Sequence, residues 1–583
     1  MLTTFVAMLK RYFPILDWLP NYKKSYWSGD ISAGVTVGIM LIPQGMAYAL
    51  IAGLPPVYGL YAALVPNLLY AITGSSRKLA VGPVALDSLI VASGLAALKL
   101  SNLQDYIAMA LFLALFVGLL QLAMGFLKMG FLANFLSRPV VSGFTSAAAL
   151  VIAISQLKYL LGISIDALGT LAVLKEIFYK IGETNFPDLV VGLASVLLIL
   201  ALKRLHRKLP AAMAVVILSI LAVYYLPIQE GNIALVGEIP KGLPRFTMHS
   251  MGTGYWSTLF PLALTLAFIS FAEAMTMAKA VEERSNKYYT NANQELRALG
   301  ISNIVGSFFQ SYPANSGLSR TAVNVNEGAK TGLASIVSTL VVALTLLFLT
   351  PLFSYLPKAV LGAIILVAVY SLIDFKYPVE LYKQRKDEFI LLAFTFLTTL
   401  LIGISQGIII GVLFSLFLLV NRISKPHIAI LGRIKGTNYF KNVERFEKEV
   451  ETRPEILILR FDAQLFFGNK DYFKRELFRQ VTNKGEGLRY VVLNAEAINY
   501  IDSSAAKTLE QIINDLRARN IQFLIAGAIG PTRDIFYSSG LIEIIGKQSL
   551  FVRTHEAVDY CENPKTKNEI QEKISLQSKT GAM

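Results

Sequence analysis

Cysteine and histidine are nearly missing from this chain of 583 residues. Cys561 is the single cysteine, so an intrachain disulfide is impossible. The few histidines lie outside the apolar runs, at His206, His249, His427 and His555. This scarcity excludes a histidine-rich metal site and a histidine proton relay, and we expect no metal and no cofactor. No nucleophile–base arrangement appears either, so we do not expect an enzyme.

Charge is also scarce. Only 16% of the residues are charged and 54% are hydrophobic, whereas soluble domains carry about 25% charged residues. Residues 441–583 hold 41 of the 93 charges (54 basic plus 39 acidic). Two uncharged runs, Phe389–Val420 and Thr331–Pro357, exceed the roughly 20 residues that a helix needs to span a bilayer. The sequence therefore predicts a polytopic α-helical membrane protein in a lipid bilayer, followed by a soluble part.

The N-terminal stretch lacks a short apolar core with a small-residue cleavage site, so we expect no removable signal peptide. The net charge is +15. No basic stripe with interleaved aromatic residues appears, so nucleic acid is not an expected partner. Cytoplasmic loops of membrane proteins collect lysine and arginine, which explains the positive charge more simply.

The apolar segments predict fourteen membrane segments, several of them short. They centre near 31–52, 57–73, 84–99, 106–126, 140–161, 185–202, 210–227, 257–279, 296–310, 320–329, 333–350, 359–373, 389–403 and 406–420. With this count, the basic clusters all fall on one face, which the positive-inside rule makes cytoplasmic. These clusters are Lys10/Arg11/Lys23/Lys24, Lys203/Arg204/Arg207/Lys208, Arg284/Lys287 and Lys376/Lys383/Arg385/Lys386. We expect a multi-pass protein of the inner or plasma membrane with both termini in the cytoplasm.

The soluble part shows an alternation of strands and helices. Buried strands are predicted at 456–461, 488–495 and 521–527, with helices at 470–483 and 503–519 between them. This order is typical of βαβ units. The predicted domains are a cytoplasmic N-terminal segment (1–30), a transport domain (31–423), a linker (424–445), an α/β domain (446–562) and a disordered tail (563–583).

A charged residue beside a broken helix marks the most informative stretch, which reads SYPANSGLSRTAVN (311–324). Pro313, Asn315 and Gly317 prevent a continuous helix, so a half-helix should begin near Leu318 with bare backbone N–H groups. Ser319 adds a hydroxyl donor. Arg320 in the hydrocarbon zone costs about 2.5–3.5 kcal/mol, so it should face protein or a water-filled cavity. Together these groups indicate an anion site.

A second break, LAVGPVALDSL (79–89), lies in the first half of the apolar region. Gly82 and Pro83 end one element there, and the N–H groups near Val84 and Ala85 should be exposed. Short, broken segments in both halves indicate an inverted-repeat carrier with a site near the bilayer midplane. Two opposed half-helix N-termini attract negative charge, so the substrate should be an anion.

Other polar side chains lie in the apolar runs. Gln44 and Tyr48 are four residues apart and share one helical face. Glu273 and Asp87 are acids among apolar neighbours. Such an acid either pairs with a residue like Arg320 or takes up a cation, H⁺ or Na⁺, and thereby couples cation movement to anion binding.

Several long motifs resemble the sulfate permease (SulP) family, relatives of the animal anion exchangers and prestin. They are GVTVGIMLIPQGMAYALIAGLPPVYGLYAALVPNLLYAITGSSRKLAVGPVAL (34–86), FAEAMTMAKA, NANQELRALGISNIVGSFFQSYPANSGLSRTAVN and LGRIKGTNYFKNV. The resemblance covers nearly the whole chain. It implies a seven-plus-seven inverted repeat with core and gate domains, half-helices in segments 3 and 10, a homodimer and an elevator-type movement. It also implies a cytoplasmic STAS (sulfate transporter and anti-sigma factor antagonist) domain.

The resemblance also implies roles for residues. Gln44, Tyr48, Val84, Ser319 and Arg320 would bind the anion. Glu273 matches the acid of proton-coupled relatives, and a sodium-coupled bicarbonate relative uses a carboxylate of the same segment. Asp87 has no counterpart in the family pattern, so its role stays open. In the STAS loop NYIDSSAAKTL (499–509), Ser503 or Ser504 matches a phosphorylatable serine, although a helix N-cap pair is the simpler interpretation.

We therefore expect a secondary active transporter of a small inorganic anion, with proton-coupled sulfate uptake as the first hypothesis. Sodium-dependent bicarbonate uptake and anion exchange are the alternatives within transport. A sensor or scaffold, in which the STAS domain works and the membrane part only anchors it, is the alternative outside transport.

Overall fold

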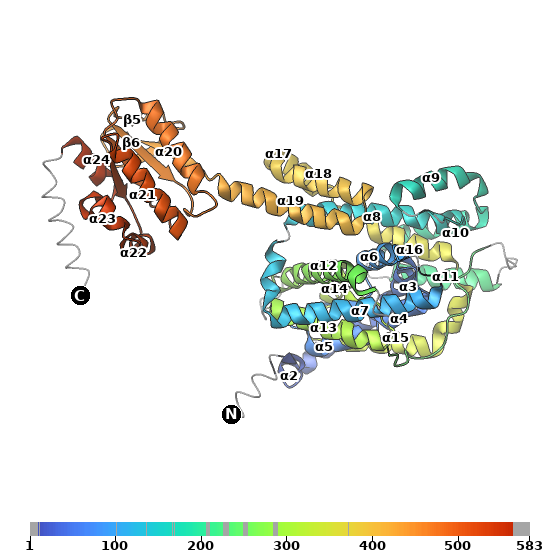
Figure 1. Cartoon of the computed structure of the whole chain (residues 1–583). Helices are drawn as coiled ribbons and strands as arrows, with labels where there is room; N and C mark the ends of the chain where they lie inside the picture. The colour runs from blue at the N-terminus through green and yellow to red at the C-terminus, as the bar shows by residue number, and fades with distance from the viewer. Residues whose placement is uncertain are drawn as a thin grey trace. The chain divides into compact units, whose positions relative to one another are not determined.

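The computed structural model describes residues 10, 12–98, 100, 102–135, 137–165, 167, 169–205, 210–225, 233–248, 255–283, 290–370 and 372–563. The chain forms two compact units, Met1–Ser415 (unit 1) and Leu416–Met583 (unit 2) (Figure 1). Some predictions lie outside the described residues: the first part of the N-terminal segment, the tail from residue 564, and His206, His249, Arg11, Arg207, Lys208, Arg284 and Lys287.

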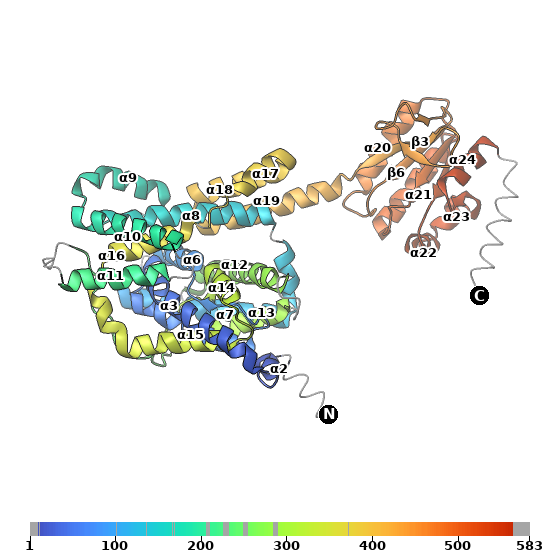
Figure 2. The ribbon, with the colours of Figure 1, turned by 180° about the vertical axis from the view of Figure 1, so that it is seen from behind.

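Unit 1 is built from helices, which Figure 2 shows from behind. Within the described residues, eight helical stretches are long and apolar enough to cross a membrane: Lys24–Ile51, Pro56–Thr73, Leu103–Phe126, Arg138–Leu161, Phe186–Leu205, Trp256–Lys279, Leu333–Tyr355 and Gln406–Ser424. The polytopic α-helical prediction is confirmed, and the count of fourteen segments stays a prediction.

The helices of unit 1 have the following bounds: α2 (Ile15–Trp18), α3 (Trp27–Ile51), α4 (Pro56–Ala62), α5 (Val65–Thr73), α6 (Ala85–Ala96), α7 (Leu103–Phe126), α8 (Arg138–Leu161), α9 (Thr170–Lys180), α10 (Phe186–Leu205), α11 (Ala211–Tyr225), α12 (Trp256–Glu283), α13 (Ala292–Phe308), α14 (Leu318–Asn326), α15 (Leu333–Leu344), α16 (Lys358–Tyr370), α17 (Lys376–Gln384) and α18 (Lys386–Leu401). Helix α19 (Ile404–Ser424) continues into unit 2. Short turns of other helix types are η1 (Lys24–Tyr26), η2 (Met129–Phe135), η3 (Ile181–Glu183), η5 (Thr345–Leu349) and η6 (Thr350–Tyr355).

Small residues allow the helices of unit 1 to pack closely. A Cβ atom on Gly118 of α7 would lie 2.7 Å from the carbonyl oxygen of Gly300 on α13. Only a residue without a side chain fits there, as is common where membrane helices touch. Large apolar side chains instead face outward on other helices, such as Leu197 on α10 and Phe417 on α19. A hydrocarbon environment suits those exposed side chains.

Two short strands of unit 1 form an antiparallel pair, which we call the crossing because it joins the two broken helical segments. β1 (Val81–Gly82) pairs antiparallel with β2 (Asn315–Ser316), and α6 and α14 follow directly after them. The amide of Asn67 on α5 supports this crossing, because its Oδ1 accepts from the N–H of Val81. Its Nδ2 donates to the hydroxyls of Ser338 and Thr339 on α15. The crossing is therefore fixed to both halves of unit 1.

Two buried carboxylates also join distant segments. Glu295 on α13 accepts hydrogen bonds from the hydroxyl of Tyr70 and from the N–H groups of Ser75 and Ser76, and also from the Ser75 hydroxyl. Asp30 on α3 accepts from the N–H groups of residues 330 and 331, at 2.6 and 3.1 Å, and from the Thr331 hydroxyl. These hydrogen bonds tie α13 and α3 to segments that are distant in the sequence.

Unit 2 contains a mixed sheet with the order β4-β3-β6-β7-β8-β9, and β5 also pairs with β3. The parallel strands run from β6 to β9, and β3 is antiparallel to β6. Alternate residues of β6 face different layers: Leu457 and Leu459 pack with α20, α21 and α23, whereas Ile458 packs with α24. The bounds are β3 (Ile428–Ile434), β4 (Phe440–Asn442), β5 (Val450–Glu451), β6 (Ile456–Phe461), α20 (Lys470–Lys484), β7 (Tyr490–Asn494), α21 (Ser503–Arg517), β8 (Gln522–Ala526), α22 (Gly530–Ser538), α23 (Leu541–Ile545), η7 (Lys547–Ser549), β9 (Leu550–Phe551) and α24 (Thr554–Glu562).

The predicted linker at 424–445 is wrong for most of its length. β3 and β4 occupy this range and form a hairpin at the edge of the sheet. Arg433 and Gly432 interrupt the apolar pattern of β3, but its buried residues Ala429 and Leu431 still alternate with less buried ones. One side of the strand therefore belongs to the core of unit 2.

Candidate functional site

The two helix breaks predicted from sequence meet at the β1–β2 crossing. Val81 pairs with Ser316, and Gly82 pairs with Asn315. α6 then begins at Ala85 and α14 begins at Leu318. Both half-helices start where the sequence predicts them, and their N-termini lie at the ends of the same two-residue ladder.

Among the described residues, the half-helices α6 and α14 begin without a side-chain cap, as α3 and α8 also do, whereas α7 and α13 each have one. α7 is capped by Asn102 and α13 by Asn291, whose side chains accept from the first turn. A helix begins with N–H groups that have no acceptor within the helix, and together with the helix dipole they attract an anion.

Arg320 lies inside the crossing and is 1% exposed. Its Nη1 donates to the carbonyl of Pro83 at 3.0 Å, while Nε and Nη2 have no hydrogen-bond partner among the described residues. The guanidinium lies against Gly317, where a Cβ atom would be 2.5 Å from Cζ. A buried charge with idle donors is costly, so these donors are available to an anionic ligand.

Two tyrosines lie near Arg320, and a buried glutamine lies on the same helix as one of them. Gln44 and Tyr48 on α3 are both buried, and the Gln44 Oε1 has no partner in the part of the chain that the structure describes. Tyr48 and Tyr312 both interact electrostatically with Arg320. The Tyr312 hydroxyl is 3.0 Å from the Ser88 hydroxyl of α6. The structure thus brings Tyr48 together with Arg320, and Gln44 lies one turn before Tyr48 on α3.

The predicted residues at the helix starts differ in exposure. Ala85 is buried, Val84 is half-buried and Ser319 is exposed. The Ser319 side chain therefore lies on a different side of α14 from the buried guanidinium.

The two predicted acids lie close together behind the crossing. Asp87 on α6 is fully buried, and its Oδ2 accepts from the Ser270 hydroxyl at 2.8 Å. Glu273, one turn further along α12, is half-buried and accepts from Nδ2 of Asn315 at 3.2 Å. The two carboxylates interact electrostatically with each other. Asp87, Glu273 and Arg320 all belong to the described residues. Within that part of the chain, neither carboxylate forms an ion pair with Arg320.

Tyr312 and Asn315 are functional candidates that the sequence reading missed. The sequence around Asn315 predicts only a helix break, yet Asn315 pairs with Gly82 and donates to Glu273. Tyr312 precedes Pro313 in the same quoted stretch, and a tyrosine hydroxyl in a break between apolar runs is a usable signal. Neither contact could be assigned without knowing that β1 and β2 pair.

Ser503 and Ser504 lie at the exposed start of α21 in unit 2. The preceding Asp502 caps this helix, because its carboxylate accepts from the N–H groups of Ala505 and Phe467 at 2.8 Å each. The simple N-cap function thus belongs to Asp502 rather than to the serines. Regulation through either serine stays a prediction.

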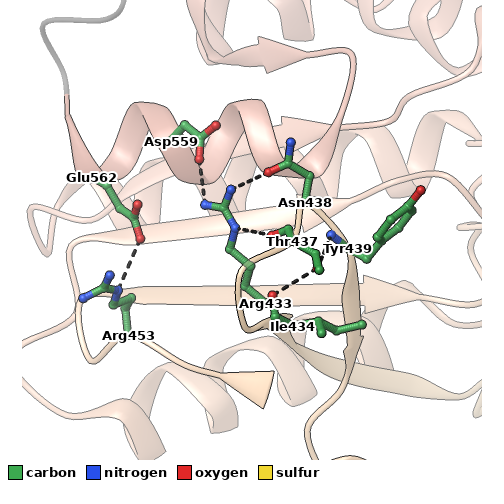
Figure 3. A network of polar contacts seen from close by, with 8 residues as sticks. All are labelled: Arg433, Ile434, Thr437, Asn438, Tyr439, Arg453, Asp559 and Glu562. Carbon is green, nitrogen blue, oxygen red and sulfur yellow. Dashed lines mark hydrogen bonds and ion pairs between the residues drawn. The ribbon is translucent and has the colours of Figure 1, made fainter. Parts of the chain in front are cut away.

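A cleft of about 260 Å³ lies in unit 2 between the β3–β4 hairpin and the end of α24. Figure 3 shows that its arginines already have acidic partners: Arg433 donates to Asp559, and Arg453 pairs with Glu562. Thr437 and Asn438 of the hairpin also accept from Arg433. We interpret this network as a clamp that holds the hairpin against α24.

Comparisons with known proteins agree with this architecture. The sulfate permease family model matches residues 27–395, and the STAS domain model matches residues 447–558. "Sulfate transporter 4.1, chloroplastic" of Arabidopsis thaliana is 38% identical over 95% of this chain and 83% of that protein. "Sulfate transporter 3.2" of the same plant is 33% identical over 95% of this chain and 89% of that protein.

Solved structures show the same fold. The murine Solute Carrier 26 family member A9 anion transporter, in its inward-facing state, superimposes with a TM-score of 0.89 at 26% identity, covering 95% of both chains. The transmembrane domain of the cyanobacterial bicarbonate transporter BicA gives a TM-score of 0.58 at 23% identity, covering 68% of this chain and 98% of that domain. The chain therefore belongs to the sulfate permease family as one of its multi-pass anion transporters, with a STAS domain in unit 2.

Proposed function

We propose that this protein carries sulfate across a membrane together with protons. The sulfate assignment is supported by the relatives named above, which are sulfate transporters by name. The anion site would consist of Arg320, the open N-termini of α6 and α14, and the side chains of Gln44 and Tyr48. Val84, Ala85 and Ser319 would contribute through their positions at the two helix starts.

One observation carries this proposal: Arg320 is buried and has two nitrogen donors without partners among the described residues. A hydrogen bond to a charged group contributes about 1.5–3 kcal/mol. An oxyanion that accepts from Nε and Nη2 would therefore gain affinity and also relieve the cost of burying the guanidinium.

The test is uptake of labelled sulfate into liposomes that contain the purified Arg320→Ala variant. Loss of about 3 kcal/mol of binding free energy corresponds to roughly 100-fold weaker binding, so uptake at low sulfate should fall by at least that factor. Arg385→Ala, which removes an exposed arginine, is the matched control. Uptake by Arg320→Ala that equals the control would reject this site.

The same assay separates the alternatives. Uptake that needs Na⁺ and is inhibited by bicarbonate would replace the proposal with sodium-dependent bicarbonate transport, and uptake that needs an internal anion would indicate exchange. The absence of flux for every anion would favour the STAS-based sensor. The elevator movement, the homodimer, the cytoplasmic termini and the inner or plasma membrane stay predictions.

A further inference from the structure

Asp87 has no assigned role, although it is among the most deeply buried charged side chains of unit 1. Its exposure is 0%, and Oδ1 has no hydrogen-bond partner among the described residues. Glu295 and Asp30 are equally buried, but each accepts several hydrogen bonds from hydroxyl and N–H groups. Within the described part of the chain, Asp87 has only the Ser270 hydroxyl and the Asn315 amide beside it, so it has fewer donors than either of these two carboxylates.

The groups that face Asp87 do not supply a positive charge. Glu273 approaches it from α12 and Tyr312 from the segment before β2. Tyr312 also interacts electrostatically with Arg320 and Tyr48. The charged residues of α7 and α8, which also pack on α6, lie near the ends of those helices, at Asp105, Arg138 and Lys158.

Asn315 determines which cation suits this pair of acids. Its Oδ1 accepts from the backbone N–H of Ser316 at 2.7 Å, and that N–H can donate only to an oxygen. Nδ2 must therefore point toward the carboxylates, and it donates to Glu273. Ser270 likewise donates its hydroxyl hydrogen to Asp87. A metal cation needs oxygen ligands around it, and the NH₂ group of Asn315 beside Glu273 cannot serve as one. The pair of acids therefore suits a proton better than a metal cation.

We propose that Asp87 and Glu273 each take up one proton with every sulfate, so that two protons accompany one sulfate dianion. This inference rests on the proposed function of the Arg320 site. When the site is empty, Arg320 and two carboxylates sum to one negative charge. When sulfate is bound and both acids are protonated, the sum is again one negative charge. The sulfate charges thus replace the carboxylate charges.

The position of Asp87 gives this exchange a mechanism. Asp87 is the third residue of α6, so its carboxylate interacts with the dipole of the same N-terminus that attracts the anion. Sulfate and an ionised Asp87 therefore compete for one helix end. A proton from the outer solution binds the carboxylate when sulfate arrives, and it leaves to the inner solution when sulfate is released.

The test is the limiting accumulation of labelled sulfate in liposomes that contain the full chain, with a pH gradient of one unit and the membrane potential clamped at zero by potassium and valinomycin. Each coupled proton raises the inside-to-outside ratio about tenfold per pH unit. The unaltered protein should therefore reach about 100-fold accumulation, and Asp87→Asn about tenfold. The double variant Asp87→Asn/Glu273→Gln should show none.

Membrane potential provides a second readout that does not depend on the amount of folded protein. Uptake by the unaltered protein moves no net charge, so a negative interior should not change its accumulation. Asp87→Asn would move one negative charge inward, so its accumulation should fall about tenfold for each 59 mV. Asp87→Val, which also removes the carboxyl group, should behave in the same way, and Glu183→Gln, an exposed acid of η3, should match the unaltered protein.

The outcomes separate the two proposals. If the unaltered protein accumulates sulfate with the pH gradient but Asp87→Asn reaches the same ratio, the role of Asp87 is rejected and the proposed function stands. If Asp87→Asn and Asp87→Val are both unfolded in a thermal unfolding assay, Asp87 is structural and the inference is rejected. If the unaltered protein shows no proton-driven sulfate uptake, the proposed function and this inference are both rejected.

Discussion

The half-helices α6 and α14 share one architecture but carry opposite charges. Each follows a strand of the β1–β2 ladder and begins without a side-chain cap, and its third residue is ionisable: Asp87 in α6 and Arg320 in α14. A helix N-terminus stabilises an acid and destabilises a cation. Asp87 is therefore electrostatically favoured at its position, whereas Arg320 is not. The difference agrees with the two proposals, in which Arg320 binds the anion and Asp87 changes its charge during transport.

The sharpest way to break this comparison is to displace the guanidinium without removing it. In Gly317→Ala, the new methyl group would lie 2.5 Å from Cζ of Arg320, so the flexible side chain must move. A misplacement of about 1 Å can cost roughly 100-fold in activity. We expect sulfate uptake to fall between about 10- and 100-fold, while the unfolding temperature changes little.

Gly182→Ala is the control for this variant, because a Cβ atom at Gly182 meets no atom within 4 Å. It should transport like the unaltered protein. If Gly317→Ala also transports normally, the position of the guanidinium beside Gly317 is unimportant for binding.

A second change sharpens the contrast between Asp87 and a structural acid. Glu295→Gln replaces a carboxylate that accepts from Tyr70, Ser75 and Ser76 with an amide whose NH₂ group would face those donors. We expect unit 1 to lose about 2 kcal/mol of stability, measured as a lower unfolding temperature in detergent. The number of protons carried per sulfate should not change. A changed proton number in folded Glu295→Gln would show that the donor count does not distinguish coupling acids from structural ones.

The smallest expected effect concerns a helix start that has a cap. Asp502→Ala removes the acceptor for the N–H groups of Ala505 and Phe467. We expect unit 2 to lose about 1 kcal/mol of stability, visible as earlier unfolding by circular dichroism, with sulfate uptake unchanged. Asp534→Ala, in the exposed part of α22, is the control. Equal stability of the two variants would contradict the assignment of Asp502 as a cap.

Local chemistry explains what could be predicted in the membrane unit. Proline restricts the backbone and lacks an N–H donor, and glycine is too flexible to favour a helix, so the starts of α6 and α14 follow from Pro83 and Gly317. The pairing of Gly82 with Asn315 joins segments separated by more than two hundred positions, and no local pattern indicates it. The contacts of Asn315 and Tyr312 depend on that pairing, which is why only the structure reveals them.

Contacts between distant segments also explain why the linker predicted in unit 2 is wrong. β6, β7 and β8 are buried on both faces, and their continuous apolar runs make them easy to predict. β3 lies nearer the edge of the sheet and carries Gly432 and Arg433, so its pattern resembles a linker. The partner of Arg433, Asp559, lies 126 positions away. Only the folded sheet shows why an arginine is accommodated there.

The burial of Cys561 has a practical consequence. This thiol lies in α24, and burial raises its pKa to about 12, so almost none of it is the reactive thiolate at neutral pH. Unit 1 contains no cysteine at all. The natural chain should therefore react little with maleimide dyes, and a pair of introduced cysteines could follow the transport cycle by fluorescence while the native Cys561 stays in place.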